Sequence, residues 1–189
     1  MALSAKKTGK NYQDISFETT AYSIADWIII RLPKTASAKL PSRGQAMVEG
    51  IINGVSFQTP LEPDGNWSHW FRIDKDLQKA VKLSPGDHLK IKIKAVEKWP
   101  NPSLPVDLKK ALSTSSQAND LWQQITPMAR WEWVRWIRST GSKETRQRRI
   151  EVAISKLKAG KRRPCCWNRN LSSEPSVSKN GVLLDPLEA

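Results

Sequence analysis

Apolar and polar residues alternate along several short segments in the first half of the chain. The clearest case is residues 89–95, where three lysines separate four apolar side chains. A period of two places one set of side chains in the interior and the other in solvent, as in a half-buried β-strand. Five further segments between residues 15 and 73 have strand character and are separated by turn signals such as Asn53-Gly54. Six short strands at this spacing predict a small closed β-barrel, because closure removes the exposed sheet edges.

The apolar positions take a helical period in the second half. Residues 99–105 form a linker between the two patterns, since three prolines in seven residues exclude a helix and a central strand. Beyond this linker we expect three to four helices, one opening at Thr126-Pro127 and the last running from Ser142 to Gly160. The expected fold is therefore α+β, with a small closed β-barrel of about six strands followed by a C-terminal helical module of three to four helices.

Both ends of the chain lack an apolar pattern, and we expect them to be disordered. The pattern thus divides the chain into five segments. Their expected bounds are a disordered N-terminus at 1–13, a β-barrel domain at 14–98, the linker at 99–105, a basic helical domain at 106–163 and a disordered tail at 164–189.

Positive charge is concentrated in the helical half. The formal net charge of the 189 residues is +13, and residues 126–163 hold twelve Lys and Arg against three Glu. Such an excess attracts polyanions, of which nucleic acid is the leading candidate: cations hold phosphates while an aromatic ring stacks on a base. The residues expected to form this surface are Trp131, Arg135, Arg138, Arg148, Arg149, Lys161, Arg162 and Arg163.

Two plainer interpretations of the same residues stay open. Trp131 shares a helix face with two arginines, but it could instead pack on the barrel or rest against the arginine stems. The cations that follow the last helix could simply complement the negative end of its dipole.

The sequence holds no pattern that is typical of a metal, nucleotide or nucleophile site. His69 and His88 lie outside any ligand pattern, and Cys165 and Cys166 have no second pair for a zinc site. The phosphate-binding glycine loop and the Gly-x-Ser-x-Gly elbow are both absent. We therefore expect no metal and no cofactor, and we favour a binding protein over an enzyme.

No apolar run is long enough to span a bilayer, and the basic N-terminus is not followed by the apolar run of a secretory signal. We therefore expect a cytoplasmic protein without a membrane span.

Several short motifs resemble those of the YdeI/OmdA-like proteins, a widespread prokaryotic family. In the barrel half these are Ile52-Asn53-Gly54 and Gly86-Asp87, and in the helical half a Trp-rich stretch at 130–137 followed by Glu144-Thr145-Arg146. The resemblance covers about residues 14–163, although Thr140-Gly141 stands where the family commonly has Ala-Lys. The residues that match motif positions are Arg130, Glu132, Trp136, Glu144, Thr145 and Arg146.

The resemblance implies an N-terminal barrel domain of unknown function and a helical C-terminal domain. It supplies no established reaction or cofactor, and the family's label, bacteriocin-protection, points to stress resistance. The simplest interpretation of the motif residues is a structural lock between the last two helices. Trp136 would pack at its centre, and Arg146 would pair with Glu132 or Asp120. A functional pocket built from the same residues is the alternative.

Three functional hypotheses follow. The first is a stress-related binding protein whose basic helices contact a polyanion. The second is a small-ligand or enzymatic site at the barrel mouth or at the barrel–helix interface, lined by Trp67, His69 and Trp70. The third is a protein-interaction module that uses the Trp131 face.

Overall fold

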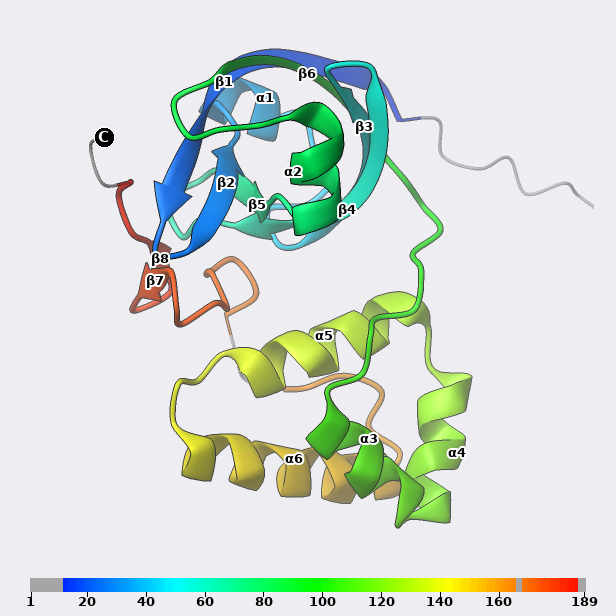
Figure 1. The fold of residues 1–189 in the computed structure, drawn as a ribbon. Coiled ribbons are helices and arrows are strands. Elements are labelled where there is room, and N and C mark those ends of the chain that lie inside the picture. Colours follow the sequence, from blue (N-terminus) through cyan, green and yellow to red (C-terminus); the bar gives the residue numbers. More distant parts are fainter. Residues whose placement is uncertain (1–11, 166–167, 187–189) are drawn as a thin grey trace, which may run out of the picture.

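A computed structural model describes residues 12–165 and 168–186 of the chain. Its first half is a closed antiparallel barrel with the strand order β1-β2-β5-β4-β3-β6, shown in Figure 1. Most of the expected disordered N-terminus lies outside the described residues. The barrel strands are β1 (Asp14–Ile24), β2 (Trp27–Arg31), β3 (Ala46–Ile52), β4 (Val55–Pro63), β5 (His69–Arg72) and β6 (His88–Ala95), with the short helices α1 (Lys34–Ser37) and α2 (Lys75–Val81) in the connections.

The alternating pattern of β6 places its apolar side chains in the barrel interior, as predicted. Ile91 and Ile93 are buried, while Lys90 and Lys92 point outward and pair with acidic residues of the neighbouring strand β1. The β3–β4 hairpin turns at Asn53 and Gly54, whose φ angles of 49° and 80° are positive at both positions. The hairpin signal in the sequence therefore has the expected cause, because a type I′ turn requires positive φ at both central residues.

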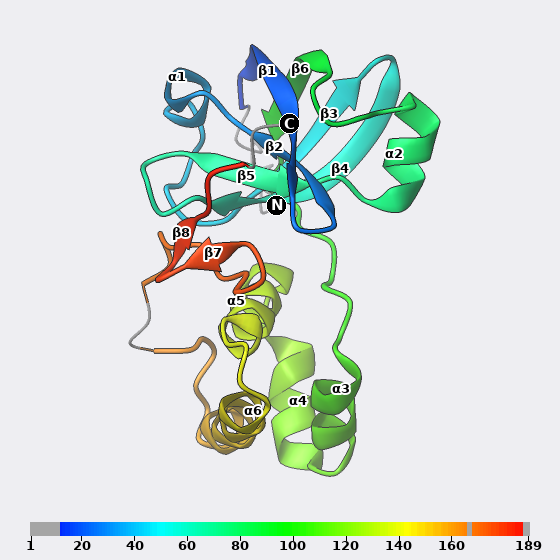
Figure 2. The ribbon, with the colours of Figure 1, turned by 60° about the vertical axis from the view of Figure 1, so that its left-hand side comes forward.

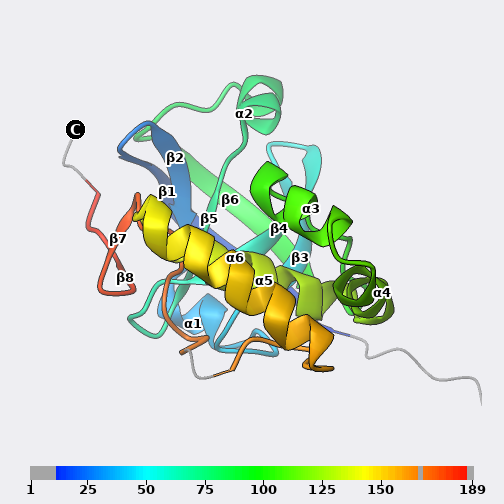
Figure 3. The ribbon, with the colours of Figure 1, turned by 90° about the horizontal axis from the view of Figure 1, so that it is seen from below.

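Four helices follow the linker, and the fold class predicted from the sequence is confirmed. Leu108, Trp122, Trp133, Ile150 and Leu157 lie in their common apolar core, which is separate from that of the barrel. Figure 3 shows α6 on the side away from the barrel, so that α5 is the helix nearest to the strands. Their bounds are α3 (Val106–Ser113), α4 (Ser116–Gln124), α5 (Pro127–Arg138) and α6 (Lys143–Lys158).

The last part of the chain differs from the expected disordered tail. Residues 168–186, called the C-terminal segment below, return to the barrel and form the strand pair β7 (Ser178–Lys179) and β8 (Val182–Leu183). Val177 and Leu183 are buried in a cluster with Ile29 and Trp70 of the barrel. As Figure 2 shows, this segment lies between the barrel and α5. Burial of apolar side chains offsets the entropy cost of ordering it.

No helix among the described residues combines the length and the apolar character that crossing a membrane requires.

Candidate ligand site at the junction of barrel and helices

A buried ion pair joins α5 to the barrel. The Nε atom of Arg135 donates to Glu62 Oε2 at 2.8 Å, and the side chains are only 1% and 10% exposed. The same guanidinium donates to Ser173 Oγ and to the carbonyl oxygen of Leu171, at 3.2 Å in each case. Arg135 is therefore a structural residue that connects barrel, helix and C-terminal segment.

A second ion pair lies beside the first. Arg138 donates to the carboxylate of Glu174 in the C-terminal segment. Burial raises the pKa of Glu174 above its ordinary value, and Arg138 only partly opposes this shift. Desolvation therefore destabilises the ionised form of Glu174, while the ion pair with Arg138 holds the segment on α5.

The expected nucleic-acid face of α5 is consequently occupied by contacts within the chain, with Arg135 buried and Arg138 partly exposed. Arg135 and Arg138 contact Glu62 and Glu174 as described, and the indole N–H of Trp131 donates to the carbonyl oxygen of Pro100 at 2.9 Å. The Trp131 ring also packs edge-on against Trp99 of the linker. These three residues do share one side of α5, as the helical period predicted, but that side faces the barrel, the linker and the C-terminal segment.

The other cations of the predicted surface differ in whether they have a partner within the chain. Arg149 donates to the carbonyl oxygen of Trp136 at 2.6 Å, and Arg163 pairs with Glu132 at 2.8 Å. Arg148, Lys161 and Arg162 are exposed. The structure brings only these last three to the surface without a described ion pair.

The family-motif residues do form structural contacts, but not the expected pair. Arg146 binds Asp107 of α3 through two nitrogens, at 2.6 and 3.0 Å, and this lowers the pKa of the Asp107 carboxyl. The prediction of an Arg146–Glu132 or Arg146–Asp120 pair is therefore wrong. Glu132 lies on the barrel side of α5, where Arg163 and Arg169 both donate to its Oε1 atom. The helical wheel of one helix could not show which neighbour Arg146 meets.

The remaining motif residues fix helix ends and packing. Arg130 donates to the carbonyl oxygens of Trp122 and Gln123 at the end of α4. Trp136 packs edge-on against Trp133 in the helical core. Glu144 and Thr145 lie in the first turn of α6, where the Thr145 N–H donates to Ser142 Oγ. These contacts agree with a structural role for the motif.

A pocket lies where the barrel, the linker, α5 and the C-terminal segment meet. We call it the junction pocket, and its volume is about 210 Å³. Both halves of the chain are required to form it, which is typical of ligand sites between domains. Its lining residues are Ser42, Arg43, Gly44, Gln45, Trp99, Met128, Glu132, Arg135, Arg169 and Asn170.

One lining residue has an unused hydrogen-bond acceptor. Gln45 Nε2 donates to Glu62 Oε1 at 2.6 Å, and this fixes the amide orientation because a carboxylate only accepts. The opposite atom, Gln45 Oε1, is buried and has no partner among the described residues. A buried acceptor without a donor costs about 1–3 kcal/mol. A ligand that carries an N–H or O–H group would remove this cost.

A neighbouring hollow of about 260 Å³ shares Arg43 and Asn170 with the junction pocket. Trp67 lines it, is 75% exposed and has a φ of 66°. A bulky residue in the left-handed region is uncommon and marks a site where the backbone is constrained. Of the three residues expected at an interface site, Trp67 thus lines a hollow, whereas His69 and Trp70 are each 1% exposed.

His69 forms a buried pair with Ser37. Its Nδ1 lies 2.8 Å from Ser37 Oγ and its Nε2 lies 2.8 Å from the carbonyl oxygen of Gly44. That carbonyl can only accept, so Nε2 carries the proton and Nδ1 accepts from the hydroxyl. Burial lowers the pKa of His69, which keeps the ring neutral. Because Ser37 is 0% exposed, the pair fixes the loop that carries Arg43 and Gln45 and reaches no substrate.

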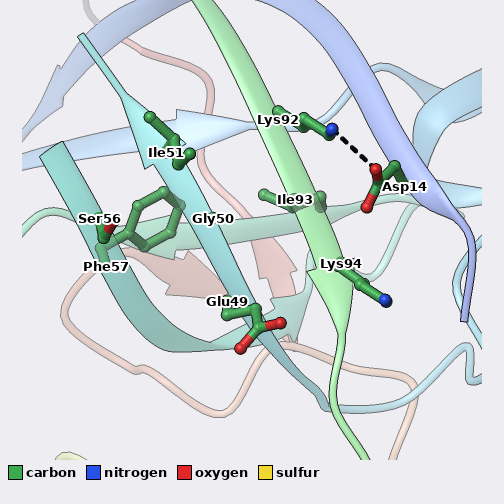
Figure 4. Close-up of a pocket in the computed structure, with 9 residues that line it drawn as sticks. All are labelled: Asp14, Glu49, Gly50, Ile51, Ser56, Phe57, Lys92, Ile93 and Lys94. Carbon is green, nitrogen blue, oxygen red and sulfur yellow. Dashed lines mark ion pairs between the residues drawn. The ribbon is translucent and has the colours of Figure 1, made fainter. Parts of the chain in front are cut away.

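A different hollow, of about 320 Å³, opens on the outer wall of the barrel and is shown in Figure 4. Lys92 and Asp14 form an ion pair at its side, at 2.7 Å. Gly50 lies at its floor beside Phe57, where a Cβ atom would come within 2.8 Å of the Phe57 ring. The charges at this hollow are matched across strands, and its lining shows no buried polar atom that lacks a partner among the described residues.

Comparison with protein families gives two adjacent matches. Residues 101–160 match the family described as "Bacteriocin-protection, YdeI or OmpD-Associated", and residues 17–93 match "Domain of unknown function (DUF1905)". The helical half of the chain is thus similar to the YdeI/OmdA family, and the barrel half is similar to the domain of unknown function. The resemblance read from the motifs is thereby confirmed, with its barrel domain in front. No curated protein matches the chain.

The C-terminal segment lies outside both matched regions of this YdeI/OmdA-like chain. It nevertheless supplies Arg169 and Asn170 to the junction pocket. Sequence reasoning missed these two residues, together with Arg43, Gln45 and the role of Trp99. They occupy loops, where no periodicity indicates which way a side chain points.

Among the described residues, no group of three His, Cys, Asp or Glu side chains is arranged to hold a metal ion.

Proposed function

We propose that this YdeI/OmdA-like protein binds a small ligand in the junction pocket. The observation that carries the proposal is Gln45 Oε1, a buried acceptor without a described partner in the lining of a pocket built by both halves of the chain. The Ser37–His69 pair and the Glu62–Arg135 pair hold this lining in place, so that the site is preorganised. Preorganisation favours binding because little conformational entropy is lost when the ligand enters.

The proposal predicts ligands that depend on Gln45. A library of small polar compounds would be screened against the full chain by the rise in melting temperature, with hits confirmed by calorimetric titration. We expect hits whose affinity falls about tenfold or more in Gln45→Leu, in line with the loss of one hydrogen bond to a buried group. Gln58→Leu is the matched control, because Gln58 is exposed on the barrel wall. Equal binding by both variants would contradict the proposal.

A second candidate is binding of a polyanion such as nucleic acid at the end of α6. Lys161 and Arg162 are exposed there, next to Lys158, and this favours a smaller surface than the sequence suggested. Binding to labelled DNA and RNA would be measured across a salt series, since phosphate contacts give a steep salt dependence.

The matched variants for this second candidate are Lys161→Ala/Arg162→Ala and Lys75→Ala/Lys79→Ala. Both remove two positive charges, but Lys75 and Lys79 lie on α2 of the barrel half. If only the first pair of substitutions weakens nucleic-acid binding and makes its salt dependence shallower, the result supports the candidate. If both pairs weaken binding equally, binding depends on net charge alone.

A further inference from the structure

We propose that the junction pocket accepts a phosphate monoester attached to a flat, N–H-bearing ring, the chemical class of a nucleoside monophosphate. The phosphate group lies at Arg43 and the ring lies beside Gln45 and Trp99. This inference rests on the proposed function and names the ligand class of the same site.

The first argument is the charge of Arg43. Its guanidinium is half-buried and donates to the carbonyl oxygen and the hydroxyl of Ser37 and to the carbonyl oxygen of Trp67. All three acceptors are neutral, and no carboxylate of the described residues forms an ion pair with it. A partly desolvated cation that contacts only neutral groups gains from an anionic ligand, and guanidinium and phosphate match in geometry.

The second argument is the charge balance around the pocket. The lining holds Arg43, Arg135 and Arg169 against the single carboxylate of Glu132, while Glu62 and Arg163, outside the lining, pair with Arg135 and Glu132. Three positive charges against one negative charge in the lining leave an excess of two. A phosphate monoester carries about −1.5 to −2 charges at neutral pH, so its charge offsets this excess better than that of a carboxylate.

The third argument is the donor that Gln45 requires. The buried Oε1 atom only accepts hydrogen bonds, so it cannot bind an anionic oxygen and requires a donor. The ligand must therefore combine an anionic end with a separate N–H or O–H group. The purine and pyrimidine rings that carry N–H groups meet this requirement.

The fourth argument is the aromatic wall. Trp99 and Met128 supply the apolar part of the junction pocket, and Trp67 supplies that of the adjoining hollow. Arg43 lines both hollows, so a ligand with its phosphate at Arg43 has one indole available in each hollow. Stacking of a base on an aromatic side chain contributes about 1–3 kcal/mol. The two hollows, of about 210 and 260 Å³, are too small for a folded polymer, and the proposed ligand would extend across both.

The test is calorimetric titration of the full chain with each of the four ribonucleoside 5′-monophosphates, with the matching nucleosides, and with inorganic phosphate. We expect at least one monophosphate to bind about tenfold or more tightly than its nucleoside and than phosphate. Arg43→Ala should weaken that monophosphate about 10–100-fold and leave the nucleoside unchanged. Arg43→Lys, which keeps the charge but not the guanidinium geometry, guards against a loop that fails to fold and should weaken the monophosphate less than Arg43→Ala does. Arg148→Ala removes an exposed charge and should change nothing.

A monophosphate that binds no better than its nucleoside overturns the assignment of an anionic end. A monophosphate that binds no better than inorganic phosphate overturns the assignment of a flat ring to the ligand. If no probe binds but the compound screen yields Gln45-dependent ligands, this inference fails while the proposed function stands. If the screen also yields none, both fail.

Discussion

The pair formed by Arg135 and Glu62 shows how one residue changes the interpretation of a charged sequence. Arg135 looks like a phosphate contact on a helical wheel, because it shares a face with Trp131 and Arg138. In the fold it is almost fully buried and meets a carboxylate that lies 73 positions earlier in the chain. A desolvated ion pair contributes modestly while both partners are present, but removal of one leaves an uncompensated buried charge.

Glu62→Ala should therefore lower the free energy of unfolding by about 3–5 kcal/mol. The measurement is denaturant unfolding at neutral pH. Glu49→Ala is the control, because Glu49 is exposed on the neighbouring strand β3, and its effect should stay within about 0.5 kcal/mol. Equal effects of the two substitutions would show that the pair is solvated rather than buried.

Glu174 gives the fold a pH dependence of a defined sign. Its folded pKa is raised by burial, so the folded state binds more protons than the unfolded state in the range between the two pKa values. The free energy of unfolding should therefore fall as the pH rises through the ordinary glutamate range, and the loss is complete above the folded pKa.

In Glu174→Gln this contribution is absent. The stability of the variant relative to wild type should increase between about pH 4 and pH 7, as measured by urea unfolding at each pH. Asp107, whose pKa is lowered, gives the opposite trend at lower pH, where its stabilising pair with Arg146 is lost. A stability difference between wild type and Glu174→Gln that does not change with pH would refute the assigned role of Glu174.

At the scale of elements, the C-terminal segment is the part that connects the two halves. It contributes Val177 and Leu183 to a cluster on the barrel, and it contributes Ser173 and Glu174 to the contacts with α5. The segment forms an ordered layer because its apolar side chains find a surface that the barrel leaves uncovered at Trp70.

Leu183→Ala should weaken the attachment of the C-terminal segment to the barrel. We expect a loss of about 2–5 kcal/mol from the removal of a buried leucine, and faster hydrogen exchange in the segment than in the barrel strands. Leu184→Ala is the matched control, since Leu184 is 41% exposed. Unchanged exchange in Leu183→Ala would mean that the segment is held by its polar contacts alone.

The sequence predicted the elements better than it predicted their contacts. The alternation of outward lysines with inward apolar residues identified β6, and Asn53-Gly54 identified the β3–β4 hairpin. Both signals are local in the sequence. Asn180-Gly181 is the same hairpin signal, and its φ angles of 53° and 80° form the same kind of turn. This signal does not stand out in the sequence because its flanking strands are too short to show an alternating pattern.

The candidate site could not be predicted in the same way. Arg43, Gln45 and Trp99 lie in loops, and Arg169 comes from a segment with no apolar period of its own. Their meeting depends on the packing of α5 against the barrel, which is a long-range property. Of the lining residues, the sequence pattern indicates only Glu132 and Arg135, on the helix, and for Arg135 it predicts solvent exposure where the fold has burial.

At the scale of the whole molecule, the two apolar cores are connected by the buried ion pair and by the C-terminal segment. We expect the chain to unfold in one calorimetric transition despite its two cores, because unfolding of either half exposes the same interface. In Glu62→Ala/Leu183→Ala this coupling should be lost, and two transitions should appear. Two separate transitions already in the wild-type chain would disprove the coupling.

The return of the chain to the barrel also has a mechanical consequence. β1 and β8 lie at opposite ends of the described chain, and both belong to the barrel side of the molecule, where the N–H of Leu183 donates to the carbonyl oxygen of Asp64. A force that pulls the two ends apart is therefore carried first by β8 and its contacts on the barrel. The helices would bear tension only after those contacts have sheared, so that stretching detaches the segment and opens the junction pocket before any helix unwinds.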